Sequence, residues 1–188
     1  MPATTVLAIG GAIVFLAYEV VLRRRDDQTS TWRSEDGDRG STRLILGAYA
    51  VVIAVNVASG DASTGSVAPS GRWAGVVCMA AGLAVRAWAM STLGQHYTRT
   101  LRTVDEQQVV DRGPYRVVRH PGYSGSILVW VGYSLALGNW IATAITMVLL
   151  GAIYAWRINA EEALLRRSFG DRYADYQRHT KRLLPYVY

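Results

Sequence analysis

Apolar residues in this chain are gathered into five runs that polar segments separate. They cover residues 6–22, 44–58, 73–93, 123–137 and 141–156. Each run approaches the roughly 20 residues that a helix needs to cross a bilayer, and all but the third are slightly short of that length. The pattern predicts an all-α, polytopic membrane protein with about five transmembrane helices.

The last two runs are separated only by Gly138, Asn139 and Trp140. Glycine and asparagine favour turns, and so short a connection leaves room for nothing longer than a turn. We therefore expect a tight helical hairpin at this point.

Basic residues are distributed unevenly between the polar segments. All of the Lys and Arg residues except Arg72 and Arg86 lie in the segments 23–43, 94–122 and 157–188. Basic loops stay on the cytoplasmic side of a membrane. Five spans then place the N-terminus outside, and the three basic segments, including the C-terminus, in the cytoplasm.

Composition supports a membrane protein and excludes several other classes. The chain has 188 residues, which fits one domain, and 51% of them are hydrophobic. The formal net charge is +6, but the charges lie between apolar runs, which indicates contact with membrane lipids rather than nucleic acid. The single cysteine, Cys78, excludes a disulfide framework within the chain. Oligomeric state cannot be inferred from these features.

Arg86 is the one basic residue inside an apolar run. An arginine at the centre of a span costs about 2.5–3.5 kcal/mol on insertion scales. We expect its side chain to face the interior of the helix bundle, with snorkelling to a nearby interface as the alternative.

Residues 113–125, with the sequence GPYRVVRHPGYSG, lie just before the fourth apolar run. Gly-Pro and His-Pro disfavour continuous helix, so we expect a polar loop that leads into a helix N-terminus. Such an N-terminus suits an anionic group of a ligand. The alternative is a basic loop that only anchors the next helix at the lipid headgroups.

Two pairs of opposite charges follow the fifth run at a spacing of one helical turn. Arg157 and Glu161 are four residues apart, as are Glu162 and Arg166. Ordinary ion pairs explain this spacing, and Glu162 with Arg166 can point to water. Arg157 directly follows a span, where a charge is usually paired, snorkelling or functional.

The order of these features resembles the isoprenylcysteine carboxyl methyltransferase family, membrane enzymes with an RHPxY…EE signature. The matching residues are Arg119 to Gly125, the pair Glu161-Glu162, and Phe169-Gly170 with the tyrosines and proline that follow. The resemblance covers residues 94–188, about half of the chain. Phospholipid N-methyltransferases share this design, and the NADPH-binding membrane sterol reductases do so more loosely.

The resemblance implies a single integral membrane domain, residues 1–188. Residues 1–93 would form three transmembrane helices, and residues 94–188 the methyltransferase-like region. S-adenosylmethionine would bind in a cytoplasm-facing pocket that a loop and the C-terminal helix form. Arg157 and Glu161 would be catalytic, with Arg157 holding the substrate. The implied cofactor residues are Gln107, Gln108, Val109, Val110, Tyr115, His120, Pro121, Gly122, Tyr123 and Glu161.

The chemistry of these residues fits methyl transfer to a lipophilic or lipidated acceptor. A carboxylate acceptor, as in a prenylcysteine, needs alignment and desolvation but no base. A sulfonium favours a carboxylate and an aromatic face, which Glu161 and Tyr123 offer, and a carboxylate favours an arginine such as Arg157. An amine acceptor would need Glu161 or Glu162 as a base.

Several alternatives to carboxylate methylation stay open at this point. They are a phospholipid N-methyltransferase, an NADPH-dependent sterol-type reductase, and a membrane scaffold without enzymatic activity. A metal site is not expected, because His96 and His179 have no ligand spacing with His120.

Overall fold

The computed structural model describes residues 1–29, 41–60, 64–94 and 109–185, and their regular structure is helical except for two isolated β-bridges. The elements are α1 (Ala3–Thr29), α2 (Ser41–Ala58), α3 (Pro69–Leu93), η2 (Gly113–Arg116), α4 (Pro121–Leu137), α5 (Trp140–Phe169) and α6 (Asp171–His179). Each apolar run corresponds to one of the five longest helices. The all-α prediction is therefore confirmed for the described residues.

Two helices extend well beyond their apolar runs. Helix α1 continues through Thr29, although the segment 23–43 was expected to be a loop. Helix α5 continues from its apolar part to Phe169, so that the charged tail and the fifth run form one helix of 30 residues. Neither extension contains proline or glycine, which is why the helix does not end with the apolar residues.

Three helices in the described part of the chain are long and apolar enough to cross a membrane, namely α1 over Ala3–Leu22, α3 and α5. Helix α2 has 18 residues and α4 has 17. At a rise of 1.5 Å per residue they are about 26–27 Å long, slightly less than a hydrocarbon core of about 30 Å. Five spans therefore stay a prediction, and three are supported by length.

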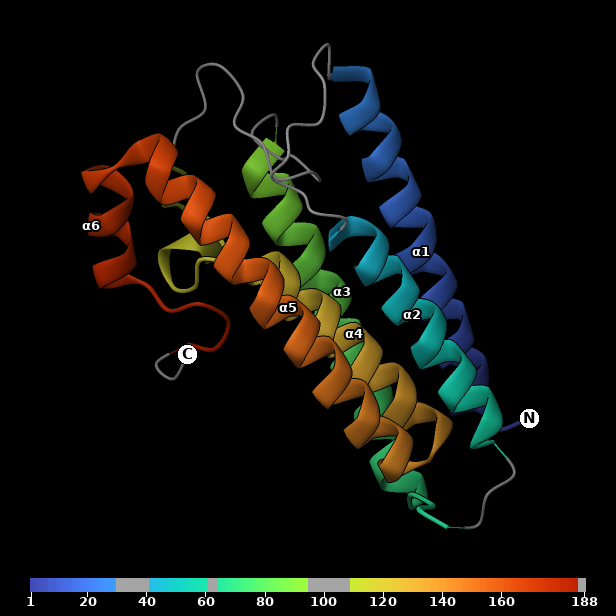
Figure 1. Ribbon diagram of the computed structural model, residues 1–188. Helices are drawn as coiled ribbons and strands as arrows, with labels where there is room; N and C mark the ends of the chain where they lie inside the picture. Colours follow the sequence, from blue (N-terminus) through green and yellow to red (C-terminus); the bar gives the residue numbers. More distant parts are fainter. Residues whose placement is uncertain (30–40, 61–63, 95–108, 186–188) are drawn as a thin grey trace.

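Helix α4 is the centre of the bundle and packs against α1, α2, α3 and α5. Figure 1 shows it behind α5, with α3 beside it and with α1 and α2 on the other side. Its residues Val129, Trp130 and Ala136 have no exposed surface. Phe15 of α1 and Tyr49 of α2 pack their rings on Trp130, at centroid distances of 5.8 and 4.8 Å. Surrounding helices thus cover most of α4, whereas Leu128 stays exposed.

Glycines bring α3 and α4 into direct backbone contact. Gly75 and Gly82 of α3 face Gly132 and Gly125 of α4, each pair of a helix being two turns apart. A Cβ atom at Gly75 would lie 2.5 Å from the main-chain nitrogen of Ala136, and one at Gly125 would lie 2.8 Å from that of Arg86. We call these four glycines the glycine seam. Small residues allow this close approach between membrane helices.

Substituting a seam glycine should destabilise the bundle. In Gly132→Ala the added methyl would lie 2.5 Å from the backbone nitrogen of Met79, which cannot move aside alone. We expect a loss of about 1–3 kcal/mol from overpacking. Gly151→Ala in α5 is the matched control, because a Cβ there meets nothing within 4 Å. Thermal unfolding in detergent should give a lower Tm for Gly132→Ala and an unchanged or higher Tm for Gly151→Ala. Equal melting temperatures would contradict the seam.

The predicted hairpin between the last two apolar runs is present. Gly138 ends α4 with φ of +96°, a conformation that favours glycine. The side chain of Asn139 then caps α5 by accepting hydrogen bonds from the amides of Ile141 and Ala142, at 3.0 and 3.1 Å. The same side chain donates to the carbonyl of Thr64, which ties this turn to the segment before α3.

Arg86 faces the interior of the bundle, as expected from the sequence. Its side chain is 6% exposed and donates to Glu19 Oε1 from Nε and Nη2, at 3.0 and 2.6 Å. Its Nη1 donates to the carbonyl of Gly122 at 3.0 Å. Glu19 lies within α1 and is buried. Because the two residues are paired, neither buried charge is left without a partner in a medium of low dielectric constant.

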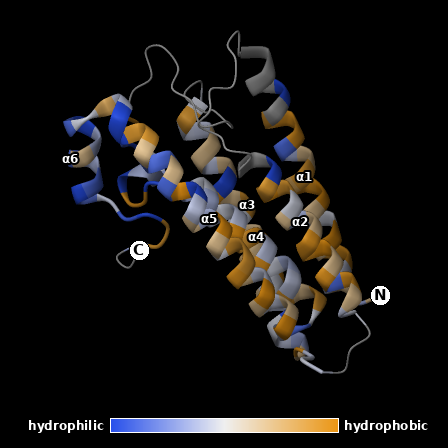
Figure 2. Ribbon diagram, viewed as in Figure 1, coloured by the Kyte–Doolittle hydropathy of each residue, from blue (hydrophilic) through white to orange (hydrophobic). Residues whose placement is uncertain are grey.

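Polar residues collect at one end of the molecule. Figure 2 shows hydrophilic positions on α6, on η2 and on the last turns of α5, while the bodies of the long helices are mostly hydrophobic. The α3 C-terminus and the α4 N-terminus lie at the same end (Figure 1). The segment 113–125 is therefore placed beside the tail, as the charge pattern predicted.

Candidate active site

The loop that leads into α4 is held by the C-terminal part of the chain. Tyr115 in η2 is buried, and its carbonyl accepts a hydrogen bond of 2.7 Å from the hydroxyl of Tyr176 in α6. Burial raises the pKa of the Tyr176 hydroxyl, so that it stays protonated and can donate. Helix α6 is thus attached to the loop.

Beyond α6, residues 180–183 run parallel to residues 117–120, and we call them the tail strap. Val118 and Lys181 form a parallel β-bridge. The main-chain hydrogen bonds that join the two segments are Lys181 N to Val117 O at 3.2 Å, Arg119 N to Lys181 O at 2.7 Å and His120 N to Arg182 O at 3.0 Å. The hydroxyl of Ser124 in α4 also donates to the carbonyl of Leu183 at 2.6 Å. The strap therefore fixes the backbone that carries His120.

Arg119 and Glu162 form the ionic centre of this arrangement. Arg119 Nε donates to Glu162 Oε1 at 2.8 Å, and the same arginine donates to the carbonyls of Gln177 and Thr180. Arg182 donates to the other carboxylate oxygen of Glu162 at 3.0 Å. The side chain of Glu162 is 3% exposed. Two guanidinium groups thus compensate its buried charge.

An ordinary ion pair of Glu162 with Arg166 on the water-facing side of the helix, which the sequence left open, is not formed. Glu162 points inward to the strap and the loop, whereas Arg166 is exposed and donates to the side chain of Gln177 at 2.7 Å. An i,i+4 pair on a helix surface is worth only a few tenths of a kcal/mol. The buried bonds to Arg119 and Arg182 therefore determine the orientation of Glu162.

Tyr123, Glu161 and Arg157 form a second group, on the adjacent side of α5. The hydroxyl of Tyr123 donates to Glu161 Oε2 at 2.6 Å and accepts from Arg157 Nε at 3.2 Å. Arg157 is 3% exposed, whereas the side chain of Glu161 is 28% exposed. The two predicted catalytic residues thus share one tyrosine, and the carboxylate of Glu161 is the more open of the two glutamates.

His120 lies between the two glutamates. Its ring stacks on that of Tyr123 at a centroid distance of 5.6 Å and an angle of 9°. Its Nδ1 is 3.9 Å from Glu161 Oε2 and its Nε2 is 3.5 Å from Glu162 Oε1. Nε2 is buried and makes no hydrogen bond within the described residues. A buried ring nitrogen of this kind is available to a polar atom of a ligand or water.

The other predicted cofactor residues differ in their positions. Pro121 and Gly122 are buried at the start of α4, and Val110 packs partly buried against the cluster that includes Tyr115. Val109 lines a cavity that is described below. Gln107 and Gln108 lie outside the described residues.

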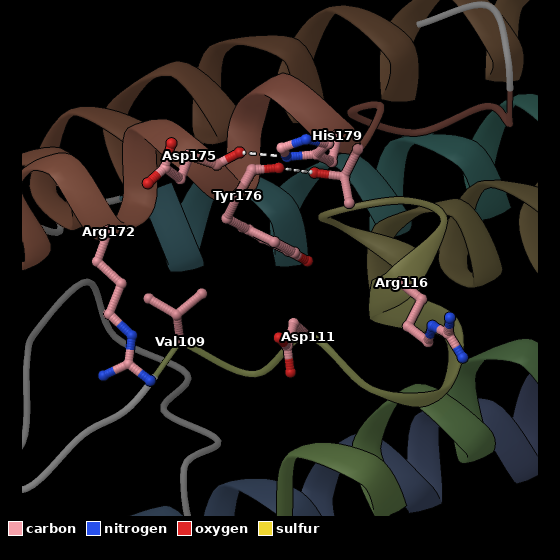
Figure 3. Close-up of a pocket in the computed structure, with 8 residues that line it drawn as sticks. Val109, Asp111, Arg116, Arg172, Asp175, Tyr176 and His179 are labelled. Atoms are coloured by element: carbon pink, nitrogen blue, oxygen red, sulfur yellow. Dashed lines mark hydrogen bonds between the residues drawn. The ribbon is translucent and has the colours of Figure 1, made fainter.

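A cavity of about 440 Å³ opens between α6 and the segment that contains η2. Figure 3 shows its lining, with Asp111 and Arg116 on one wall and with Arg172, Tyr176 and His179 on α6. Of the predicted cofactor residues that the structure describes, only Val109 is part of this lining. The charged residues of both signs make the cavity a polar, water-accessible space next to the loop, distinct from the group around Tyr123.

No metal cluster is evident in the described ranges, where His, Cys, Asp and Glu nowhere gather in threes around a common point. His120 has two carboxylates as neighbours, but both carboxylates are engaged, one by Tyr123 and one by two arginines. The expectation that no metal takes part therefore stays a prediction.

Sequence reasoning missed the residues that hold the site in place through contacts between distant parts of the chain. They are Glu162 in its buried role, Arg182, Thr180 and Ser124. Arg119 was part of the motif, but its hydrogen bonds to the tail could not be inferred from local spacing. The sequence feature that relates to the β-bridge is the adjacent apolar pair Val117 and Val118. Two residues are too short a pattern to predict a bridge with the end of the chain.

The chain is similar in sequence to a family of methyltransferases and to several known proteins. A family model described as phospholipid methyltransferase matches residues 70–172. A probable protein-S-isoprenylcysteine O-methyltransferase from Oryza sativa subsp. indica is 32% identical over 117 residues, which cover 61% of this chain and 61% of the relative. The protein-S-isoprenylcysteine O-methyltransferase of Schizosaccharomyces pombe is 34% identical over 60% of this chain and 48% of its own length. The alignments thus span about half to three fifths of these relatives.

One solved structure has a similar fold. It is a eukaryotic intramembrane Ras methyltransferase, isoprenylcysteine carboxyl methyltransferase, with a TM-score of 0.60 and 21% sequence identity. The superposition covers 78% of this chain and 52% of the other. At this identity the likeness concerns the fold, and it includes more of the chain than the family model does.

Proposed function

Because the chain belongs to the phospholipid methyltransferase family and is related to protein-S-isoprenylcysteine O-methyltransferases, we propose that it is a membrane methyltransferase. It transfers a methyl group from S-adenosylmethionine to the carboxylate of a prenylcysteine-like or other amphipathic acceptor. The observation that carries this proposal is the hydrogen-bonded group of Arg157, Tyr123 and Glu161 at the polar end of the bundle.

The residues at the polar end fit S-adenosylmethionine. When bound, it supplies an electrophilic methyl group on a sulfonium cation. Glu161 is partly exposed and Glu162 is neutralised by two arginines, so Glu161 is the carboxylate that can face an added positive charge. The ring of Tyr123 offers an aromatic face beside it. His120 Nε2 is a buried polar atom without a hydrogen bond among the described residues, which suits a polar contact to the cofactor.

The chain's own residues favour a carboxylate acceptor. Arg157 is buried and lies one helical turn from Glu161, so a cation is present in a desolvated position next to the proposed cofactor site. Such a cation attracts a carboxylate strongly. A carboxylate oxygen is already a nucleophile, so no residue has to remove a proton. Alignment and exclusion of water by the buried residues are then the main contributions.

Methylation of a phospholipid amine is the second candidate, because the matching family model carries that description. An amine must lose a proton during the reaction. Glu162 is held by Arg119 and Arg182 and is poorly placed to accept one. Glu161 would then have to act as the base, although it already accepts the hydroxyl hydrogen of Tyr123.

A transfer assay with two acceptors tests the proposal. The protein in detergent micelles is supplied with S-adenosylmethionine that carries a labelled methyl group, together with N-acetyl-S-farnesylcysteine or phosphatidylethanolamine. We expect the label in a base-labile ester of the farnesylcysteine. Label in the phospholipid amine would favour the second candidate. Oxidation of NADPH with a sterol, in the absence of methyl transfer, would favour a reductase, and no turnover of any kind would favour a scaffold.

We also propose that the N-terminus lies outside, and that the site and the C-terminus face the cytoplasm, as the distribution of basic residues suggests. In a Cys78→Ser background, Thr64→Cys and Ser168→Cys place exposed thiols at opposite ends of the bundle. A membrane-impermeant maleimide on intact cells should label position 64 and spare position 168, which should react only after lysis. Labelling of position 168 in intact cells would contradict this orientation.

A further inference from the structure

Arg86 connects α1 to the first turn of α4. Its Nε and Nη2 bind Glu19 of α1, while Nη1 binds the carbonyl of Gly122 in α4. Gly122 directly precedes Tyr123, the tyrosine that contacts both Glu161 and Arg157. Through Arg86, the buried ion pair therefore contacts the residue next to Tyr123, which belongs to the proposed reaction centre.

The carbonyl of Gly122 has an unusual number of partners. Besides Arg86 Nη1 at 3.0 Å, the hydroxyl of Ser126 donates to it at 3.1 Å. Both side chains are buried. A main-chain oxygen held by a guanidinium in low dielectric resists movement more than one held by a helix bond alone. The first turn of α4 is thus fixed from the side of α3.

Gly122 packs closely against the side chains of Met90 and Arg86. A Cβ atom at Gly122 would lie 2.7 Å from the end of the Met90 side chain and 3.0 Å from Arg86 Nη1. Gly125, one turn later, is part of the glycine seam and lies against the backbone of Arg86 itself. The arginine is consequently held by the seam and by Glu19, and it holds Gly122 in turn.

We propose that Arg86, oriented by Glu19, is a positioning residue that fixes the first turn of α4 and so the place of Tyr123 relative to Glu161 and Arg157. Glu19 lies outside residues 70–172, which match the family model. In this chain the first helix therefore serves the site and is more than a membrane anchor. The predicted effects on cofactor affinity rest on the proposed function, whereas those on α4 do not.

Two variants separate positioning from stability. Glu19→Leu/Arg86→Met replaces the pair by apolar side chains, which for buried ion pairs is often neutral or stabilising. The fold should survive, but the carbonyl of Gly122 loses its guanidinium donor and keeps the hydroxyl of Ser126. Glu19→Gln keeps an acceptor for Arg86 and keeps Arg86 on Gly122, while it leaves the buried arginine without a balancing charge. This variant should be less stable, with a smaller loss of site geometry than the double variant.

Hydrogen exchange and calorimetry measure these effects. In the double variant, the amides of the first turn of α4 should exchange at least about tenfold faster, and S-adenosylmethionine should bind about tenfold more weakly, as for a lost charge-assisted bond. The Tm should stay near the wild-type value. Glu19→Gln should have a lower Tm than the double variant, with smaller changes in the exchange rates and in the affinity for S-adenosylmethionine.

A control at the far end of the bundle excludes a general effect. Asn56 in α2 donates to Ser134 at 2.9 Å, about 16 Å along α4 from Tyr123 by helix rise. Asn56→Ala should lower the Tm and leave exchange at the start of α4 unchanged. Wild-type exchange and affinity in the double variant would overturn the proposal, as would an equal loss in Asn56→Ala. If the wild-type protein binds no S-adenosylmethionine, the proposed function fails, and the exchange rates alone decide this inference.

Discussion

Replacing Arg157 with alanine is expected to reduce methyl transfer roughly ten- to a hundredfold while cofactor affinity stays close to the wild-type value. The guanidinium is buried and, in the proposed site, holds the carboxylate acceptor. A lost charge-assisted hydrogen bond of 1.5–3 kcal/mol corresponds to a rate change of about that size. Initial rates with a farnesylcysteine acceptor, together with calorimetric titration by S-adenosylmethionine, measure the two quantities separately.

For Glu161→Gln we expect the opposite of the Arg157→Ala result, with cofactor affinity as the quantity that falls directly. The amide cannot balance a sulfonium charge, so S-adenosylmethionine should bind at least about tenfold more weakly. The hydroxyl of Tyr123 can still donate to the amide oxygen, so the local geometry should be preserved. Arg167→Ala is the matched control, because Arg167 is exposed on the same helix. Equal loss of affinity in Arg157→Ala and Glu161→Gln would mean that the residues act as one unit.

Glu162→Leu is expected to destabilise the protein by about 3–5 kcal/mol, because Arg119 would remain as a buried charge without its carboxylate. For a chain of this length the Tm should fall by roughly 6–20 °C. Arg166→Ala, one turn along the same helix, removes an exposed side chain and should change stability by no more than about 0.5 kcal/mol. Thermal unfolding in detergent measures both variants.

The two variants also decide how the tail charges are paired. If Glu162 were paired with Arg166 at the helix surface, both substitutions would have equally small effects. Proteolysis supplies a second measurement, since release of Arg119 and Arg182 should loosen the tail strap and speed cleavage within residues 180–183. Unchanged cleavage in Glu162→Leu would contradict the bonds that Arg119 and Arg182 make in the structure.

Most of the helices could be predicted from the sequence because lipid-facing helices need long apolar runs. The starts of α3 and α4 lie within four residues of the predicted runs, and both helices begin with a proline, Pro69 and Pro121. The continuation of α1 and α5 was missed for a physical reason. Hydropathy indicates which residues contact lipid. A helix, however, ends where its backbone hydrogen bonds end, as α5 does at Gly170.

The candidate site was only partly predictable. The motif and its resemblance indicated His120, Tyr123, Arg157 and Glu161, and the structure places these residues around a common tyrosine. The role of Glu162 could not be inferred, because its partners come from residues 43 positions before and 20 positions after it. Such long-range contacts depend on the folded path of the tail, which local spacing does not contain.

The glycine seam restricts the route of a lipophilic acceptor. Lipid chains pass between two membrane helices when side chains there can change rotamer and open a gap. Along Gly75 and Gly82 of α3 and Gly125 and Gly132 of α4, the contacts are between backbones, and no side chain is available to swing aside. Under the proposed function, the apolar tail of the acceptor therefore has to approach Tyr123 through another boundary of the bundle. At the α4–α5 boundary, by contrast, the rings of Tyr123 and Tyr154 lie 4.9 Å apart, so that side chains rather than backbones form the contact.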